Sequence, residues 1–343
     1  MRTVWVSALM LMCLSGCRFR PETGRPPAGA ALSRRGTSRM DHRGWKNCLR
    51  LRNGRLHMIV TAQYGGRILS FGPGGENLVY ENRDLDGMTL ESRPAAYPVD
   101  GMTLDVKPEG PGGHVALWLG QYTLEQMGPL AVRLTSPVDP NLGIQLIQDL
   151  RLVPGKMEVR LEQSMVNRSD KPVAHALWKR DMFKGEGFAF LPLNPQSSLK
   201  GGWKLMTDPV AEGPQPFDPR VRVIDDLLIL RAVGEGPENR PGKVGCDTVV
   251  GWLAYAREDW LLIKVWAPGP PAEGYRYTVE IWFQNEMCEI EPLSPWVELA
   301  PGESAALNER WYLLPLSAPC RTFDDAAALR GVVEAFLADG GQE

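Results

Sequence analysis

Beyond its first forty residues the sequence has no block of basic residues, and this absence limits what the protein can bind. Its 343 residues hold 38 Lys and Arg against 41 Asp and Glu, for a formal net charge of −3. Nucleic-acid-binding proteins usually carry a basic patch, so we expect no nucleic-acid partner. The sequence also lacks Cys-x-x-Cys pairs, zinc-type Cys/His spacings, a Ser/His/Asp arrangement and a phosphate-binding loop. We therefore expect no metal site and no cofactor.

The apolar run at the start, within "MRTVWVSALMLMCLSGC", is too short to span a bilayer. Such a run after an early basic residue is typical of an export signal. Its ending, Leu14-Ser15-Gly16-Cys17, resembles the bacterial lipobox, in which the cysteine is lipidated and becomes the mature N-terminus. The alternative is a plain secretory signal that contains Cys17 by chance. By the same resemblance, Arg18 in place of Asp predicts a lipid-anchored protein of the bacterial cell envelope at the outer membrane rather than the inner one.

The composition divides the rest of the chain into three parts. Residues 18–40 are rich in Arg, Pro, Gly and Ala and hold almost no large apolar residue. They cannot bury enough surface to offset chain entropy, so we predict a flexible tether. Residues 41–317 are predicted to form one β domain, and residues 318–343 a C-terminal helix and tail. Thr322 is placed to cap that helix, and acidic residues follow it in the first turn.

Short alternating segments broken by Gly, Pro, Asn and Asp run through the whole β domain. Examples are "RLHMIVTA", "KMEVRLEQSMVN", "DWLLIKVWA" and "YRYTVEIWFQN". Many short strands with regular turns predict an all-β sandwich or barrel. Two stretches, 82–113 and 207–243, are rich in Pro and Gly with little periodicity, and we predict long loops there.

The four cysteines after the tether leave two alternatives open. Cys48, Cys246, Cys288 and Cys320 could form up to two disulfides in an oxidising compartment, with three connectivities. The other interpretation is four buried free thiols.

Three segments, in chain order, resemble galactose mutarotase-like (aldose 1-epimerase-like) domains. They are "RLHMIVTAQYGGRILSFGPGGENLVYEN", "LVPGKMEVRLEQSMVNRSDKPVAHALW" and "EIEPLSPWVELAPGESAALNERWYLLPL", and together they span most of 45–316. The resemblance implies a galactose mutarotase-like β-supersandwich whose concave face binds sugars. The chain looks closest to lineages without an assigned activity.

The stretch "EMCEIEP" contains the carboxylates that fit acid/base chemistry best. Cys288 and Ile290 should face the core, so alternation turns Glu289 and Glu291 to the other side of their strand. Two ionised carboxylates so close require a basic neighbour, and we predict Arg67 or Lys179. Such a pair is either a functional site or an ordinary solvated strand face.

Sugar epimerisation requires an acid as well as a base. Epimerases of this type are known for a Glu base near the C-terminal hairpin and a His acid on the strand after the Asn-to-Pro turn. Here that strand shows Trp178, Lys179 and Arg180 where the histidine is expected, and the nearest histidine is His175. The catalytic candidates are therefore Glu289, Glu291 and His175, while the simpler interpretation is that His175 packs near a turn.

The aromatic pattern favours sugar binding with or without catalysis. Trp282 and Glu280 are two residues apart, so they share one face of their strand. A pyranose can stack on the indole ring of such a Trp while its hydroxyl groups reach carboxylates. Packing between sheets is the alternative use of such a Trp. The predicted ligand-binding residues are Arg67, Lys179, Asp181, Glu280, Trp282, Glu289, Glu291 and Trp296.

The sequence thus predicts an envelope-anchored carbohydrate-binding protein, joined to the membrane through Cys17. One alternative is a sugar epimerase or other carbohydrate-modifying enzyme that uses Glu289 or Glu291 with a nonstandard acid. Another is a structural envelope lipoprotein with a vestigial cleft. The sugar and the oligomeric state stay open.

Overall fold

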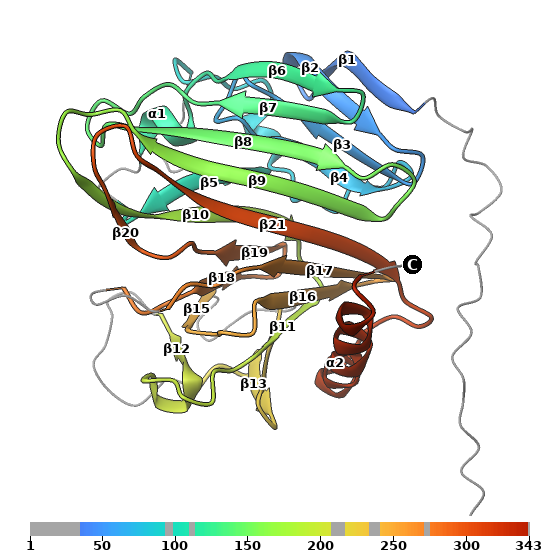
Figure 1. Ribbon diagram of the computed structural model, residues 1–343. Helices are drawn as coiled ribbons and strands as arrows, with labels where there is room; N and C mark the ends of the chain where they lie inside the picture. The colour runs from blue at the N-terminus through green and yellow to red at the C-terminus, as the bar shows by residue number, and fades with distance from the viewer. Residues whose placement is uncertain are drawn as a thin grey trace, which may run out of the picture. The chain divides into compact units, whose positions relative to one another are not determined.

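The chain folds into two antiparallel β-sheets that pack face to face, with a helix near its C-terminus (Figure 1). The computed structural model describes residues 35–92, 99–109, 114–206, 217–232, 241–270 and 275–341. Within these ranges every strand pairing is antiparallel. The prediction of an all-β fold with a short C-terminal helix is confirmed.

The first sheet has 11 strands, and its centre joins segments that lie far apart in the sequence. In spatial order it contains β1 (Gly36–His42), β2 (Trp45–Arg52), β3 (Leu56–Val60), β4 (Ile68–Pro73), β5 (Met102–Lys107), β10 (Val173–Lys184), β19 (Met287–Pro292), β18 (Val279–Phe283), β15 (Gly242–Cys246) and β12 (Trp203–Leu205). The short strand β20 (Val297–Leu299) pairs with β10 off this path.

The second sheet has 10 strands. In spatial order it contains β13 (Val221–Ile224), β14 (Leu227–Arg231), β11 (Phe188–Pro192), β16 (Trp252–Arg257), β17 (Trp260–Trp266), β21 (Ser304–Pro315), β9 (Glu158–Asn167), β8 (Ile144–Leu152), β7 (Ala131–Thr135) and β6 (Thr123–Gly128). Its longest strands, β9 and β21, pair along nine residues each.

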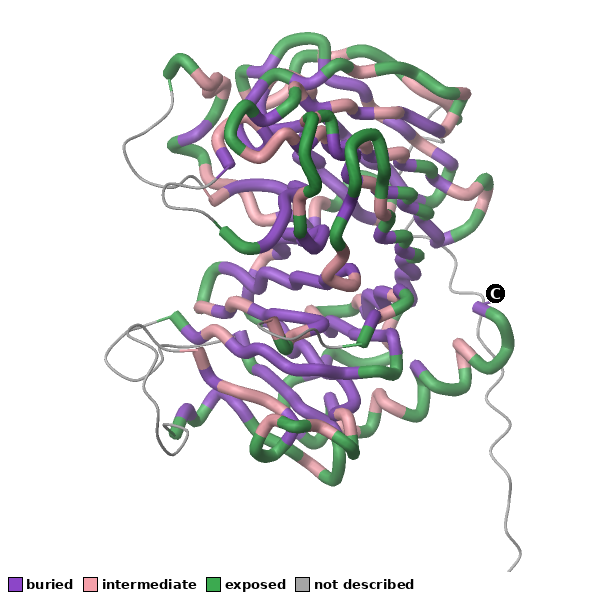
Figure 2. The backbone as a smooth tube through the Cα atoms, turned by 60° about the vertical axis from the view of Figure 1, so that its left-hand side comes forward, coloured by how far each residue is buried: buried purple, intermediate pink, exposed green. Residues whose placement is uncertain are grey.

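The main core lies between the two sheets, because alternate side chains of each strand point into that space. Phe71 of β4 meets Trp311 of β21 with ring centroids 5.6 Å apart, and Phe183 of β10 meets Tyr255 of β16 at 6.0 Å. Figure 2 shows buried backbone running through both sheets. The intervening residues of the 11-stranded sheet consequently point away from its partner sheet.

Helix α2 (Phe323–Ala338) covers the outer face of the 10-stranded sheet beside β11 and β14. The Thr322 hydroxyl accepts a hydrogen bond from the Asp325 N–H, and the Asp325 carboxylate accepts one from the Thr322 N–H. This capping box fixes the start of the helix and confirms Thr322 as its cap. Phe323 then packs edge-to-face on Phe188 with centroids 5.6 Å apart. The other helical segments are α1 (Val115–Trp118), η1 (Arg83–Leu85) and η2 (Lys200–Gly202).

The prediction of two long loops is wrong in part, because each stretch contains strands. β5 lies within 82–113, and β13 and β14 lie within 207–243. β5 reads "MTLDVK", with apolar residues at every second position, but the Pro and Gly around it masked this alternation. Strand β1 begins at Gly36, inside the range assigned to the tether.

A charged cluster is buried between the sheets, among the apolar core residues. Lys264 of β17 pairs with Asp181 of β10 and lies 3.0 Å from Glu309 of β21, while Lys179 lies 3.1 Å from Asp181. All four side chains are fully buried. The Trp311 indole N–H donates to Glu309 at 3.0 Å. Two cations and two carboxylates balance the charge, which is the condition for burying ions at tolerable cost.

The described structure has buried free thiols at Cys48, Cys246, Cys288 and Cys320. Of the two alternatives left open by the sequence, the structure therefore has thiols rather than disulfides. The signal and lipobox, including Cys17, lie outside the described residues. Within those residues, no helix combines the length and the apolar character needed to cross a membrane.

Candidate functional site

Polar side chains gather on the face of the 11-stranded sheet that points away from the other sheet. Strand β10 shows why: Leu177, Lys179 and Asp181 point into the inter-sheet core, so Trp178 and Arg180 point outward. On the neighbouring strand β19, the core position of Ile290 turns Glu289 and Glu291 outward in the same way. The predicted orientation of the two glutamates is confirmed.

Strand register brings further groups to this outer face. Glu291 of β19 lies opposite Glu280 of β18, and Glu289 lies opposite Trp282. Lys243 of β15 lies opposite Trp282 on its other side. Directly opposed residues in antiparallel strands have Cβ atoms about 5 Å apart, so the two carboxylates are close neighbours.

Two lysines offset the charge of the paired carboxylates, and an indole N–H donates a hydrogen bond to one of them. The Lys243 Nζ lies 2.7 Å from Glu280 Oε2 and 3.1 Å from Glu291 Oε2. The Lys107 Nζ, at the end of β5, lies 3.3 Å from Glu280 Oε2 and 3.5 Å from the centre of the Trp178 ring. The Trp178 Nε1–H donates to Glu291 Oε2 at 2.7 Å. We call Lys107, Trp178, Lys243, Glu280 and Glu291 the carboxylate–lysine cluster.

Glu289 has its own cation beside this cluster. The Arg180 Nε–H donates to Glu289 Oε1 at 2.8 Å. The Arg180 guanidinium also lies over two indole rings, 4.4 Å from the centroid of Trp178 and 4.7 Å from that of Trp118. The sequence predicts a basic neighbour for this pair of carboxylates, and the structure has one for each glutamate. The partners are Arg180 and Lys243, so the prediction of Arg67 or Lys179 is wrong.

Partly exposed aromatic residues border the cluster. The Tyr275 hydroxyl donates to the Glu280 carboxylate, and its ring stacks on Trp296 with centroids 6.3 Å apart and an interplanar angle of 28°. Tyr275, Trp282 and Trp296 are all half-buried. Strand β18 begins only at Val279, so the alternation of Glu280 and Trp282 does not extend back to Tyr275.

Burial and charge separate the acidities of the two paired carboxyls. The pKa of Glu291 is raised to about 7, chiefly because the side chain is completely buried. The neighbouring Glu289 and Glu280 carboxylates raise this pKa further, and Lys243 offsets the increase only in part. Burial also acts to raise the pKa of Glu280, but Lys243 and Lys107 outweigh it and bring this pKa to about 2. Glu280 is therefore ionised at neutral pH, while Glu291 can exchange a proton there. A pKa near the working pH suits a general acid or base.

Several buried polar atoms on this face have no hydrogen-bond partner among the described residues. They are Glu291 Oε1, Asp105 Oδ2, Thr103 Oγ1 and the Trp282 Nε1–H. Thr103 and Asp105 lie on β5, opposite Arg180 and Trp178. Buried polar groups are nearly always satisfied in folded proteins. These atoms are thus polar groups on this face whose hydrogen-bonding capacity is unfilled.

A histidine–carboxylate pair adjoins the cluster. The His114 Nδ1 lies 2.7 Å from Asp105 Oδ1, and Asp105 lies opposite Trp178. Burial acts to lower the pKa of His114, but the Asp105 carboxylate outweighs it and the pKa is raised. His175, the predicted acid, has its Nδ1 3.2 Å from the Lys107 carbonyl oxygen, and burial lowers its pKa. No motif in the sequence marks His114, because its partner Asp105 lies on strand β5, which was not predicted.

Seven of the eight predicted ligand-binding residues fall into two groups. Glu280, Trp282, Glu289 and Glu291 share the outer face, and Trp296 joins them through Tyr275. Lys179 and Asp181 lie on the opposite face, inside the charged cluster between the sheets. The structure does not bring these two groups together, because neighbouring residues of one strand point to opposite faces.

Arg67 is fully buried beside Trp118 and does not pair with either glutamate. It donates to backbone oxygens of Tyr64 and Asp100, and its guanidinium lies 5.6 Å from the Trp118 ring centroid. A bulge in β4 interrupts the alternation just after Arg67: Ile59 pairs with Ser70 and Val60 with Ile68, which leaves Leu69 extra.

Sequence reasoning missed Lys107, Trp178, Arg180, Lys243 and Tyr275 as members of the site. The alternation of β5 could have revealed Lys107. Alternation along β10 predicts that Trp178 and Arg180 share the face opposite Lys179. The local sequence does not show, however, which of these two faces lies beside Glu289. Lys243 lies at the end of a stretch predicted as loop.

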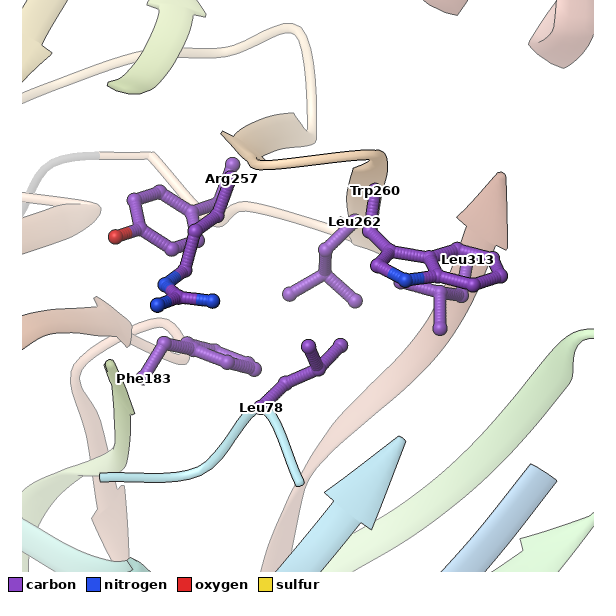
Figure 3. Close-up of a pocket in the computed structure, with 7 residues that line it drawn as sticks. Leu78, Phe183, Arg257, Trp260, Leu262 and Leu313 are labelled. Carbon is purple, nitrogen blue, oxygen red and sulfur yellow. The ribbon is translucent and has the colours of Figure 1, made fainter. Parts of the chain in front are cut away.

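Two pockets elsewhere in the described structure are not lined by Glu280, Glu289 or Glu291. The pocket in Figure 3 holds only about 10 Å³ and is lined mainly by apolar groups, among them Leu78, Phe183 and Leu262, with Arg257 at its edge. That volume is about enough for one water molecule and too small for a sugar. A second pocket, of about 420 Å³, lies beside the start of α2.

Solved structures define the fold. The chain resembles a galactose mutarotase-like protein from Lactobacillus casei, with a TM-score of 0.56 and 11% identity over 78% of this chain and 100% of that one. It also resembles candidate aldose 1-epimerases from Klebsiella pneumoniae (TM-score 0.55, 14% identity, 87% and 86% covered) and Escherichia coli K12 (TM-score 0.52, 13% identity, 78% and 98% covered). No family model and no curated protein matches the sequence. The chain therefore has the galactose mutarotase-like fold, at low sequence identity.

Proposed function

We propose that the protein binds carbohydrate on the outer face of its 11-stranded sheet, between the carboxylate–lysine cluster and the half-buried aromatic residues. The observation that supports this most directly is Glu291 Oε1, a buried acceptor without a partner beside Lys243 and Trp282. Sugars need such acceptors and donors for their hydroxyl groups, together with an aromatic surface for their C–H face. Tyr275, Trp282 and Trp296 supply that surface. The likeness in fold to mutarotase-like proteins supports the same class of ligand.

Glycan binding tests this proposal. Glu291→Gln keeps the shape of the side chain but removes a charged hydrogen-bond acceptor. We therefore expect it to weaken binding about 10-fold or more for a glycan that the wild type binds on an array. The measurement is a glycan array followed by titration calorimetry. Glu286→Gln is the matched control, since Glu286 is exposed in the turn between β18 and β19 and should leave binding unchanged. Equal affinity of the wild type and Glu291→Gln would contradict the proposal.

A second candidate function is sugar epimerisation. The pKa of Glu291, raised by burial to about 7, favours it, as does the His114–Asp105 pair nearby. Polarimetry with free glucose and galactose separates the two functions, and we expect no fast mutarotation. Robust turnover that is lost in Glu289→Gln or Glu291→Gln would replace the binding function by the enzymatic one. A protein that neither binds glycans nor turns them over would instead be a structural envelope protein with a vestigial site.

We also propose that Cys17 is lipidated and anchors the protein in the bacterial envelope, at the outer membrane. The lipobox-like sequence Leu14-Ser15-Gly16-Cys17 supports this. In cells fed labelled palmitate, Cys17→Ser is expected to abolish labelling and to accumulate unprocessed precursor. Cys13→Ser, four residues earlier in the same segment, is the control and should be labelled normally. Unchanged labelling of Cys17→Ser would remove the anchor from the proposal.

A further inference from the structure

A pocket of about 420 Å³ lies between the start of α2 and the edge of the 10-stranded sheet, on the other side of the molecular core from the carboxylate–lysine cluster. Three arginines line it: Arg222 of β13, Arg231 of β14 and Arg321 just before the helix. Its volume falls within the usual range for small-molecule sites. Phe188 and Phe323 supply apolar walls.

Strand pairing directs two of the arginines to the same place. Arg231 lies opposite Phe188, and Arg222 lies opposite Ile229, two residues before Arg231. All four side chains therefore share the sheet face on which α2 packs, and Arg222 and Arg231 are diagonal neighbours within reach of one ligand. The Arg222 guanidinium lies 4.4 Å from the centroid of Phe323 in the first turn of the helix.

Most carboxylates near this pocket bind other partners than the three pocket arginines' guanidinium groups. The Asp325 carboxylate accepts hydrogen bonds from the backbone N–H groups of Arg321 and Thr322. Asp226 pairs with Arg330, and Asp218 lies 2.7 Å from Arg220. Among the described residues, no carboxylate lies within 4.0 Å of the guanidinium groups of the three pocket arginines. Asp324 is the one acidic residue that lines the pocket with them.

We propose that this pocket binds a phosphomonoester. Three guanidinium groups and one carboxylate leave a local charge of about +2, which matches the charge of −1.5 to −2 that a phosphomonoester carries at neutral pH. A guanidinium group can bind a phosphate through two parallel N–H···O hydrogen bonds. The positive end of the dipole of the 16-residue helix α2 also attracts an anion at this place. The phosphate is carried either by a soluble small molecule or by a lipid headgroup.

Two arms of one experiment distinguish these sources in the full chain. Inorganic phosphate and glycerol phosphate are titrated by calorimetry, and vesicles of phosphatidylcholine with or without phosphatidic acid are tested by flotation. In the arm that binds, Arg222→Gln combined with Arg231→Gln is expected to weaken binding about 100-fold, since each lost arginine–phosphate contact costs about tenfold. Arg321→Gln alone is expected to weaken it about tenfold. Binding in the first arm indicates a soluble ligand, and binding only to phosphatidic acid vesicles indicates a lipid.

Arg151→Gln is the matched control, because Arg151 is an exposed arginine of β8 in the same sheet. It should bind like the wild type. The unfolding midpoint of the double variant verifies that it is folded, and its glycan binding should be unchanged because it leaves the carboxylate–lysine cluster intact. The proposal is overturned if wild type and double variant behave alike in both arms, or if neither arm shows binding.

Discussion

Lys264→Met is expected to lower the free energy of unfolding by about 3–5 kcal/mol, because it leaves buried carboxylates without their shared cation. Lys264 pairs with Asp181 and Glu309 in the fully buried cluster between the sheets. Burial acts to lower the pKa of Lys264, but these two carboxylates outweigh it and raise that pKa. Methionine fills similar space without charge, so packing loss contributes little. Denaturant unfolding at pH 7, followed by tryptophan fluorescence, measures the change.

Lys46→Met is the control for this prediction. Lys46 forms an ion pair with Asp41 at 2.8 Å, but both side chains are more than half exposed. Exposed pairs contribute about 0–1 kcal/mol, so this substitution should change stability far less. If Lys264→Met proved no more costly than Lys46→Met, the cluster would not be the tightly buried network that the structure describes.

Lys243→Met is expected to give the second large effect, and this effect should depend on pH. Without Lys243, the opposed carboxylates of Glu280 and Glu291 repel one another in a buried setting, and we expect about 3 kcal/mol of destabilisation at pH 8. As the pH falls toward 5 the carboxyls take up protons and the repulsion fades. The cost of the substitution should therefore shrink. Unfolding free energies at several pH values measure it.

The wild-type pKa values set the direction of this pH dependence. The folded pKa of Glu291 is raised to about 7, so the stability contributed by its protonated form is present below about pH 4.5 and is lost as the pH rises to about 7. The folded pKa of Glu280 is lowered to about 2, so its contribution is present above about pH 4.5 and is lost as the pH falls to about 2. Lys243→Met removes the attraction that keeps Glu280 ionised.

Lys156→Met, an exposed lysine in the turn between β8 and β9, is the control for these measurements. It should change stability little at any pH. A penalty for Lys243→Met that is the same at pH 5 and pH 8 would mean that loss of packing, and not charge, causes it.

Several local features were predictable because they depend on nearest neighbours along the chain. The alternation of Cys288 and Ile290 with Glu289 and Glu291 predicted which way the glutamates point, and the structure confirms it. Thr322 and the acidic residues after it predicted the start of α2. Where a strand is interrupted by a bulge or begins late, as at Leu69 and Tyr275, alternation read from the sequence cannot give the face of a side chain.

By itself the sequence determined the all-β class, the closing helix and the outward direction of Glu289 and Glu291, since these follow from periods of two residues and from local capping. Only the tertiary structure decided which cations meet those glutamates. Arg180 and Glu289 are 109 residues apart in the chain, and Lys243 and Glu291 are 48 apart. Their contact depends on the strand order β5–β10–β19–β18–β15 and its register. That order is selected by the packing of the whole core between the sheets, to which each strand contributes only a few residues.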